Sequence, residues 1–511
     1  MREESLQCGI EYIRGGTCPV HELIWVPEGY PKCPDHPIWL GVFEGSWYDI
    51  GRQYGESEGV RNYITFVFDY WLGLALEGFT FSIRGLPVEG GGFEGVRIAQ
   101  KGLSFEEIVD ILHTMEEQAK LYEPNFVEAM KGEADGAAEA LAKSKYANEL
   151  SDYEKVLFLN FATYPLLYAL KPKEDCSCIA FLPPATANGK VIVGRNTQFG
   201  LNMGNYGLAY AAVPPAPAHR FVTNPIAGRL FDLGIATDTP LYISQTAAIA
   251  EARPGINDSF LMAEGAIFGN SIEEAADLIV HGSPAYREAT NRKTTLRSNP
   301  VNYTIVDAET AEVVETTATC WAVRHPGDFG ENDFIIATNH QLCQYSYDEN
   351  DVRTSVPMYD ESICNQFGGC RKEMAPQLKD KVFAGYDTEE LVIPEPGSGT
   401  RYWALHWSAM YNHGKVDLKM LQGPLFLGSR FWYDINGKKI EYQLDPQTGS
   451  WTSVSYLYYH ATVEGDSGGY PEKYKNEVPG SLIYVPADRT AYWELYKPSM
   501  WEGKWEQMTF K

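Results

Sequence analysis

The chain has 511 residues, of which 44% are hydrophobic and 22% charged, an ordinary composition for a large globular protein. Its formal net charge of −26 argues against a nucleic-acid or anionic-membrane partner, because both favour basic patches. No apolar run of about eighteen residues and no signal-like N-terminus occurs, and the nine scattered cysteines indicate reduced thiols. We therefore expect a cytoplasmic protein without a membrane-spanning helix.

The first third of the chain is predicted to be mostly helical. Residues 1–37 are rich in Gly, Pro, Cys and His and indicate an irregular arm. Residues 38–175 begin with a strand pattern and continue with helix signals, including a capping box at Ser104 and a second helix start at Ser151. The predicted segments are a strand over 39–43, a turn that leads into a helix over 44–55, and helices over 104–115, over 124–141 and from 151 to before Pro172.

After residue 175 the pattern changes to strands and turns. Residues 176–249 indicate strands, a helix follows over 271–279, and further strands are expected over 302–307 and 312–316. The last hundred residues are dense in Trp and Tyr and should be mostly strand. Helices before and between strands predict an α+β protein with a two-sheet sandwich over 176–511.

The stretch Asp175-Cys-Ser-Cys178 carries the most chemical information. It joins a charged linker to an apolar strand pattern, and a second strand pattern then ends at Gly194-Arg195-Asn196. A thiol attacks carbonyls as a thiolate and needs a base or a positive field. If Cys176 cuts the chain at the carbonyl of Asp175, its new α-amino group supplies a base with a pKa of about 8. Arg195 could then hold the thiolate by a charge-assisted hydrogen bond.

Two other patterns invite a functional interpretation. Cys18, His21, Cys33 and His36 form a repeated Cys-x₂-His pair that could hold a structural Zn²⁺, although the spacing is not that of a standard knuckle. We assign these residues no catalytic role and predict no cofactor and no catalytic metal. Gly465-Asp-Ser-Gly-Gly469 resembles a serine-protease loop, but no matching histidine segment lies upstream, and we interpret it as a turn.

The hairpin from Cys176-Ser-Cys through Asn188-Gly to Gly194-Arg195-Asn196 resembles the start of the mature chain in N-terminal-nucleophile (Ntn) hydrolases. The similarity is to the isopenicillin-N acyltransferase-like cysteine family and its choloylglycine-hydrolase and phospholipase B-like relatives. Further similar stretches, in the family's order, are 44–55, 128–136, 297–307 and Ala337-Thr-Asn-His340.

This resemblance implies an αββα four-layer sandwich, self-cleavage before Cys176, and hydrolysis or transfer of a linear amide through a Cys176 thioester. The N-terminal segment would be a zymogen's helical prosegment that stays attached as a subunit. The implied catalytic residues are Cys176, Arg195 and Asn302, with Asn302 as oxyanion donor. Asn196, Gln198 and Arg371 would contact substrate or thiolate, with Arg353 as the competitor of Arg371. The expected partner is a small amide or acyl substrate, and a homo-oligomer is left open.

Several alternatives stay open at this point. Cys176 and Cys178 share one strand face, so facing alone cannot choose between them, although a Cys-Ser opening matches related enzymes. The family's usual Asp is replaced by the neutral Gln198, and Asp175 stands where glycine is common. A phospholipase B-like esterase and a catalytically silent binding protein with the same fold are therefore the competing functions.

Overall fold

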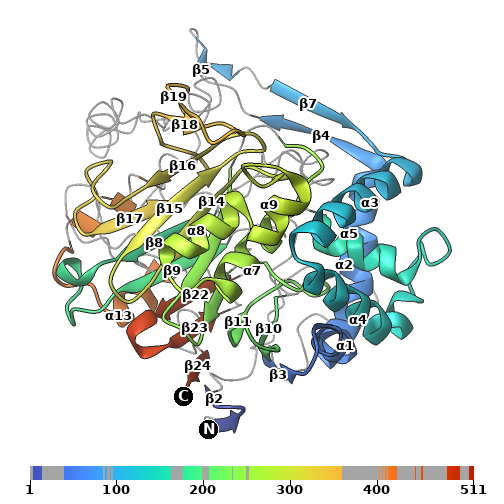
Figure 1. The fold of residues 1–511 in the computed structure, drawn as a ribbon, viewed down its shortest axis with the longest axis horizontal. Coiled ribbons are helices and arrows are strands. Elements are labelled where there is room, and N and C mark those ends of the chain that lie inside the picture. The colour runs from blue at the N-terminus through green and yellow to red at the C-terminus, as the bar shows by residue number, and fades with distance from the viewer. Residues whose placement is uncertain are drawn as a thin grey trace.

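A computed structural model defines the fold over most of the chain (Figure 1). The structure describes residues 4–13, 39–83, 87–88, 92–93, 96–162, 176–197, 207–232, 234–248, 252–358, 402, 405–406, 409–410, 412–422, 443–444, 451–452, 480–494 and 506–511. The described residues form an α+β structure built on two large sheets. None of the described helices is long and apolar enough to cross a membrane.

The larger sheet has ten strands, antiparallel except where β3 pairs with β10. Its strands, in spatial order, are β19 (Arg353–Thr354), β18 (Ser346–Tyr347), β16 (Trp321–Arg324), β15 (Ala311–Thr316), β14 (Val301–Val306), β13 (Tyr242–Ala247), β12 (Gly234–Thr237), β11 (Phe221–Thr223), β10 (Ala209–Val213) and β3 (Trp39–Glu44).

The smaller sheet has eight strands and joins both ends of the chain. In spatial order they are β1 (Glu4–Gln7), β2 (Ile10–Ile13), β24 (Glu506–Phe510), β23 (Thr490–Glu494), β22 (Gly480–Val485), β9 (Ile192–Thr197), β8 (Ser177–Phe181) and β17 (Phe334–Ala337). Three further pairs stand apart: β4 (Gly78–Ile83) with β7 (Val96–Lys101), β5 (Pro87–Val88) with β6 (Gly92–Phe93), and β20 (Gln443–Leu444) with β21 (Trp451–Thr452).

Helices from two parts of the chain cover the larger sheet. Those of the N-terminal segment gather on one side of the molecule, while α7–α9 lie across the strands (Figure 1). The helices are α1 (Trp47–Glu56), α2 (Glu58–Glu77), α3 (Phe105–Tyr122), α4 (Pro124–Leu141), α5 (Asp152–Phe161), α7 (Asp258–Phe268), α8 (Ile272–His281), α9 (Pro284–Thr290) and α13 (Leu418–Gln422); the short 3₁₀ turns are Pro183–Ala185 and Pro486–Asp488.

Strand alternation divides the core into layers, because successive side chains point to opposite faces. On β14, Tyr303 and Ile305 pack in the cluster shared with the helices, whereas Val306 packs in the cluster between the two sheets. The outer face of the smaller sheet, including Ile179 and Phe181, packs against five buried residues of the described C-terminal part: Tyr402, Leu405, Ala409, Val416 and Leu421. The molecule therefore stacks helices, the ten-stranded sheet and the eight-stranded sheet.

Helices α1 and α4 pack at backbone distance. A Cβ added at Gly51 would lie 1.8 Å from the carbonyl oxygen of Ala129, and one at Gly132 would lie 2.0 Å from that of Tyr48. Glycine is the residue that permits such close approach of two backbones. The two stretches 44–55 and 128–136, far apart in sequence, are thus packing partners.

The structure differs from the sequence expectations in several places, and the helices α2, α7 and α9 were not predicted. Residues 4–13, placed in an irregular arm, form the hairpin β1–β2, in which Ile10 and Tyr12 are buried. The hairpin of β4 and β7 interrupts the helical segment and was not expected. The predicted strands 39–43, 302–307 and 312–316 and the helix at 271–279 agree with β3, β14, β15 and α8 within a few residues.

Candidate functional site

Strand register brings the predicted nucleophile to the meeting point of three strands. Cys176 immediately precedes β8, which pairs with β9 on one side and β17 on the other. Cys178 lies opposite Arg195 on β9 and opposite Ala337 on β17. Because the β8–β17 pair is antiparallel, Asn339, two residues past Ala337, arrives beside Cys176.

The contacts of Cys176 come from both neighbours. Arg195 Nη2 donates to the Cys176 sulfur at 3.7 Å, and the Cys176 backbone N–H donates to Asn339 Oδ1 at 2.8 Å. Two carbonyls of β13, in the other sheet, hold these partners: Arg195 Nε donates to Gln245 O at 2.8 Å, and Asn339 Nδ2 donates to Ala247 O at 2.7 Å. Cys176 and Arg195 are 2% and 3% exposed, so the Arg195 charge acts on the Cys176 sulfur in a poorly hydrated site.

The two cysteines at the start of β8 have different surroundings. Cys178 packs in the core between the sheets, and its sulfur accepts a hydrogen bond from Ser244 Oγ at 3.2 Å. Burial raises the pKa of the Cys178 thiol, opposed by its hydrogen bonds and by Arg195. A fully buried thiol with a raised pKa is a poor nucleophile, which argues against Cys178. Cys176, by contrast, has a guanidinium group in direct contact with its sulfur.

Asn302 lies near the site but contacts backbone. Its Nδ2 donates to Thr338 O at 2.8 Å and to His340 O at 2.9 Å, and Thr246 Oγ1 also donates to Thr338 O at 2.8 Å. Both N–H groups of the Asn302 amide thus hold the segment on either side of Asn339. In this arrangement Asn302 fixes the position of Asn339 rather than presenting a free N–H to a reacting group.

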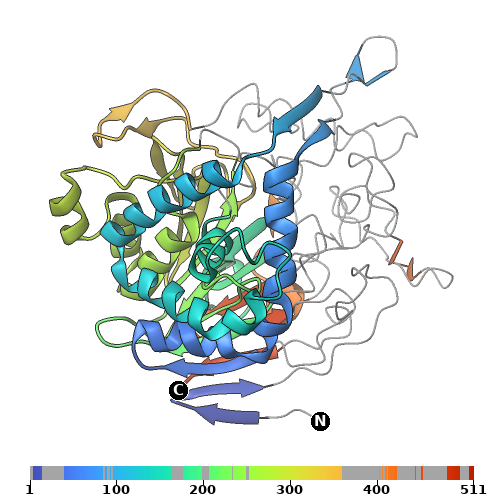
Figure 2. The same cartoon turned by 90° about the vertical axis from the view of Figure 1, so that its right-hand side faces the viewer.

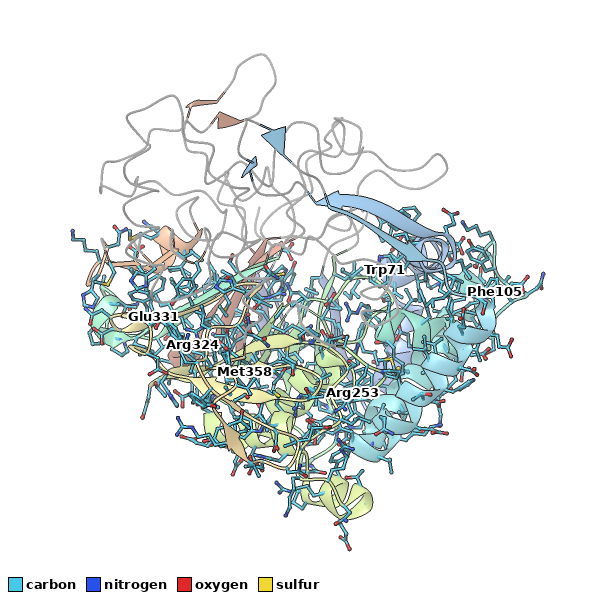
Figure 3. All side chains as sticks on the ribbon, turned by 90° about the horizontal axis from the view of Figure 1, so that it is seen from above. Trp71, Phe105, Arg253, Arg324, Glu331 and Met358 are labelled. Atoms are coloured by element: carbon cyan, nitrogen blue, oxygen red, sulfur yellow. The ribbon has the colours of Figure 1, made fainter. Side chains whose placement is uncertain are left out.

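A buried network of ion pairs and hydrogen bonds also holds the segment that follows Asn339. The Glu315 carboxylate accepts from the backbone N–H groups of Leu342 and Cys343, both at 2.9 Å, and pairs with Arg324 at 3.1 Å. Arg324 also pairs with Glu331 at 2.8 Å. Figure 3 shows these two side chains close together, on the opposite side of the view from Trp71 and Phe105 of the helical segment. Hydrogen bonds thus hold the segment around Asn339 from both of its neighbouring strands, β14 and β15.

Sequence reasoning did not single out Asn339, although it noted the surrounding stretch Ala337-Thr-Asn-His340. Asn196 lies on β9 opposite Ser177, and only its backbone is described. Arg353 is exposed on edge strand β19, with its guanidinium 4.4 Å from the Tyr345 ring centroid. Seven of the predicted residues lie outside the part of the chain that the structure describes: Asp175, Gln198, Arg371, Cys18, His21, Cys33 and His36. Over the part of the chain that is described, no group of three potential metal ligands occurs.

No protein-family model matches the chain. An uncharacterized protein from Archaeoglobus fulgidus is 23% identical over 488 residues, covering 84% of this chain and 72% of that protein.

Three solved structures show partial likeness. An N-acylethanolamine-hydrolyzing acid amidase ortholog from Caenorhabditis elegans has 18% identity and a TM-score of 0.25, covering 32% of this chain and 70% of its own. Penicillin V acylase from Agrobacterium tumefaciens has 9% identity and a TM-score of 0.32, covering 62% and 82%. A mutant of conjugated bile acid hydrolase from Clostridium perfringens has 11% identity and a TM-score of 0.31, covering 63% and 89%. Likeness at such low identities and TM-scores says nothing about the activity of this chain. Any inference about its chemistry therefore depends on the geometry of the site.

Proposed function

We propose that this protein is an Ntn-type amidohydrolase whose nucleophile is Cys176, exposed as a chain terminus by cleavage after Asp175. The observation that carries the proposal is the placement of the Cys176 sulfur against Arg195 and of its backbone nitrogen against Asn339. Both atoms that an N-terminal cysteine uses, sulfur and nitrogen, therefore have polar partners suited to their roles.

Activation starts with the thiol. The Cys176 sulfur adds to the Asp175 carbonyl carbon, and the peptide C–N bond breaks as the nitrogen takes up a proton. Water then hydrolyses the resulting thioester, releasing the Asp175 carboxylate and leaving a free α-amino group on Cys176. The Arg195 guanidinium favours the thiolate that this attack requires.

Catalysis repeats the same chemistry on an external amide. The α-amino group accepts the thiol proton, the thiolate forms a thioester with the acyl group, and the amine product leaves with a proton. Asn339 Oδ1, which accepts from the Cys176 nitrogen, is positioned to orient the amine for this transfer. Hydrolysis or transfer to a second amine completes the cycle.

The layering supports the same proposal. The described residues Tyr402, Leu405 and Leu421 pack on the outer face of the smaller sheet, opposite to the helices on the larger one. We interpret this as the αββα arrangement, with residues 38–175 as the prosegment. Both sheets contribute to the site, the smaller one through β8 and β9 and the larger one through β13. Figure 2 shows the N-terminal helices in front of these sheets.

Intact-mass analysis combined with acyl transfer tests the proposal. Wild-type protein should yield two fragments meeting at Asp175/Cys176 and should release p-nitrophenol from a p-nitrophenyl ester in a burst. Cys176→Ala should remain a single chain of 57.2 kDa without a burst. Cys178→Ala, which removes the neighbouring core thiol, is the matched control and should behave like wild type. Processing or turnover that survives in Cys176→Ala would remove the proposal, and an unprocessed wild-type chain without a burst would favour a silent binding protein.

A further inference from the structure

A single buried carboxylate holds the backbone that follows Asn339. Glu315, on β15, is 0% exposed, and its Oε2 accepts from the consecutive N–H groups of Leu342 and Cys343, each at 2.9 Å. Its other oxygen, Oε1, accepts from Arg324 Nε at 3.1 Å. Hydrogen bonds to a charged acceptor are stronger than those between neutral groups. Both oxygens of Glu315 are therefore engaged, one by the guanidinium and one by the backbone.

The partner of this carboxylate holds the backbone that precedes Asn339. Arg324, on β16, donates from Nη2 to the carbonyl of Ile336, which lies on β17. Its Nη1 pairs with Glu331 at 2.8 Å. The pair of Glu315 and Arg324 thus contacts the chain on both sides of Asn339, upstream at residue 336 and downstream at residues 342 and 343.

These contacts bear on the reacting residue, because Asn339 is joined to it directly. Asn339 Oδ1 accepts from the Cys176 nitrogen at 2.8 Å. The ladder between β17 and β8 ends where Ala337 lies opposite Cys178, so it does not reach Asn339 itself. The position of Asn339 therefore depends on contacts outside the ladder. The Asn302 amide holds the two carbonyls next to Asn339, and the ion pair holds the backbone farther along on either side.

The chemistry of the cluster favours a functional explanation for it. Buried ion pairs are costly to form, and apolar side chains of similar size often stabilise a fold as well or better. An apolar side chain at position 315, however, could not accept from the two N–H groups that Glu315 binds, and unpaired buried N–H groups are themselves costly. The carboxylate thus has a task at this backbone that packing alone does not perform.

We infer that Glu315 is a positioning residue that acts through the Asn339 segment, residues 338–344, on the nitrogen of Cys176. It keeps Asn339 Oδ1 at hydrogen-bond distance from this nitrogen, which becomes the α-amino group that accepts the thiol proton. This inference rests on the proposed function of Cys176 and adds a residue to it.

The first arm of the test is Glu315→Gln, read by the stopped-flow burst from a p-nitrophenyl ester. The variant keeps the size of the side chain and leaves Arg324 paired with Glu331. An amide has one acceptor oxygen, so its NH₂ group faces either the guanidinium or the two backbone N–H groups. We expect the burst to slow by about 10- to 10²-fold, because misplacing a group by about 1 Å costs up to that much.

The second arm repeats Glu315→Gln in an Asn339→Ala background. Without the Asn339 amide, Glu315 has no side chain to position, so the burst should slow by at most about threefold further. A general structural defect would instead slow the burst by the same factor in both backgrounds. Equal factors, or no slowing in the native background, would overturn the inference.

Glu331→Gln is the matched control, since it also removes one buried carboxylate from Arg324 and leaves the other. Apart from Arg324, Glu331 accepts from Tyr402 Oη at 2.7 Å and from the Phe329 N–H at 3.2 Å, both outside the Asn339 segment. Urea unfolding should show similar losses of stability for the two Gln variants, and Glu331→Gln should slow the burst far less. Slowing as large as that of Glu315→Gln would assign the effect to the lost charge and contradict the inference.

Glu315→Asp replaces Glu315→Gln if the latter does not fold. It keeps the charge but is one methylene shorter, so it cannot reach Arg324 and both N–H groups together. The same dependence on Asn339 is expected, and equal factors in the two backgrounds again contradict the inference. Cys176→Ala separates the two proposals. A burst in that variant, or none in wild type, removes the proposed function and the inference together, whereas equal factors on a burst that requires Cys176 remove the inference alone.

Discussion

Asn302 and Asn339 lie in adjoining parts of the site, and their amides reach different atoms. Asn339 touches the Cys176 nitrogen, whereas Asn302 donates only to the carbonyls of Thr338 and His340. The first is therefore placed to act on the reacting residue, and the second acts by fixing the first. Substituting Asn302 and Asn339 one at a time should distinguish the direct role of Asn339 from the positioning role of Asn302.

Asn339→Ala should slow acylation of Cys176 by a p-nitrophenyl ester by about 10²–10³-fold, the range seen when one oriented polar group is lost from an acyl-transfer site. Stopped-flow measurement of the burst gives this rate. Gln344→Ala is the control in the same segment, since the Gln344 amide donates locally to Leu342 O at 3.3 Å. An Asn339→Ala burst as fast as that of the control would contradict the assignment.

Glu312 on β15 should make stability depend on pH. Burial, with smaller effects of Glu273 and Asp307, raises the pKa of Glu312 to about 7 from an ordinary value near 4.5. The folded state then binds more protons than the unfolded state between these values, so stability is greatest below pH 4.5 and falls as pH rises to about 7.

Glu312→Gln should therefore leave the melting temperature unchanged near pH 4 and raise it near pH 8. The wild-type penalty at high pH is on the order of 3 kcal/mol. Thermal unfolding of both proteins at the two pH values measures the difference, and other buried carboxyls cancel in this comparison. A variant that melts below wild type at pH 8 would show that the Glu312 charge is stabilised rather than penalised.

At the scale of elements, the α1–α4 contact is the most demanding packing in the N-terminal segment. Gly132→Ala would force its methyl group against the Tyr48 carbonyl, 2.0 Å away, and both atoms belong to rigid helices. We expect a loss of about 2 kcal/mol or more in unfolding free energy, because overpacking outweighs the gain in helix propensity.

Gly73→Ala is the matched control on α2, since its methyl group would meet only Tyr146 Oη at 3.5 Å and Lys145 Nζ at 3.7 Å. That change should be neutral or stabilising by up to about 1 kcal/mol. Urea unfolding of both variants supplies the comparison. Equal stabilities would mean that the two helices can separate without cost.

Elements with local signals could be predicted from the sequence, and those without could not. Ser104 and Ser151 each begin a helix with both capping-box hydrogen bonds, as their spacing from Glu107 and Glu154 indicates. Helix α2 is buried on most sides, and its buried residues include Val60, Ile64, Phe68 and Trp71. Apolar residues therefore do not alternate with polar ones at helical spacing, and the sequence pattern does not reveal this helix.

The same distinction applies to the site. Cys176 and Arg195 belong to one hairpin, so local pattern was enough to place them together. Asn339 joins them through the pairing of β8 with β17, more than 150 residues apart in sequence. Such non-local register is set by which strands pair in the finished sheet, and a single sequence does not encode it in any short stretch.

At the scale of the whole molecule, the N-terminal segment is part of both sheets. Strand β2 pairs with β24, β3 pairs with β10, and the helices α1–α5 share one apolar cluster with the larger sheet. Cleavage at residue 175 would therefore leave the fragments joined by sheet hydrogen bonds and a common core.

Cleaved protein should elute as one particle in native size exclusion and separate into two fragments only under denaturing conditions. Buried apolar surface of this extent makes dissociation much slower than a column run. Elution of the N-terminal fragment by itself, without denaturant, would show that the shared core does not hold the two parts together.

The C-terminal residue lies beside the turn of the β1–β2 hairpin, which suits a circular permutation of the chain. Lys511 N donates to Gly9 O at 2.7 Å, and both ends emerge at the same edge of the molecule (Figures 1 and 2). A linker from residue 511 to residue 1 would allow a circular permutant that is translated from Cys176 onward, and chain ends at one edge of a molecule favour such permutants. Once its initiator methionine is trimmed, this protein would carry a terminal cysteine without any self-processing, and its activity could be assayed independently of maturation.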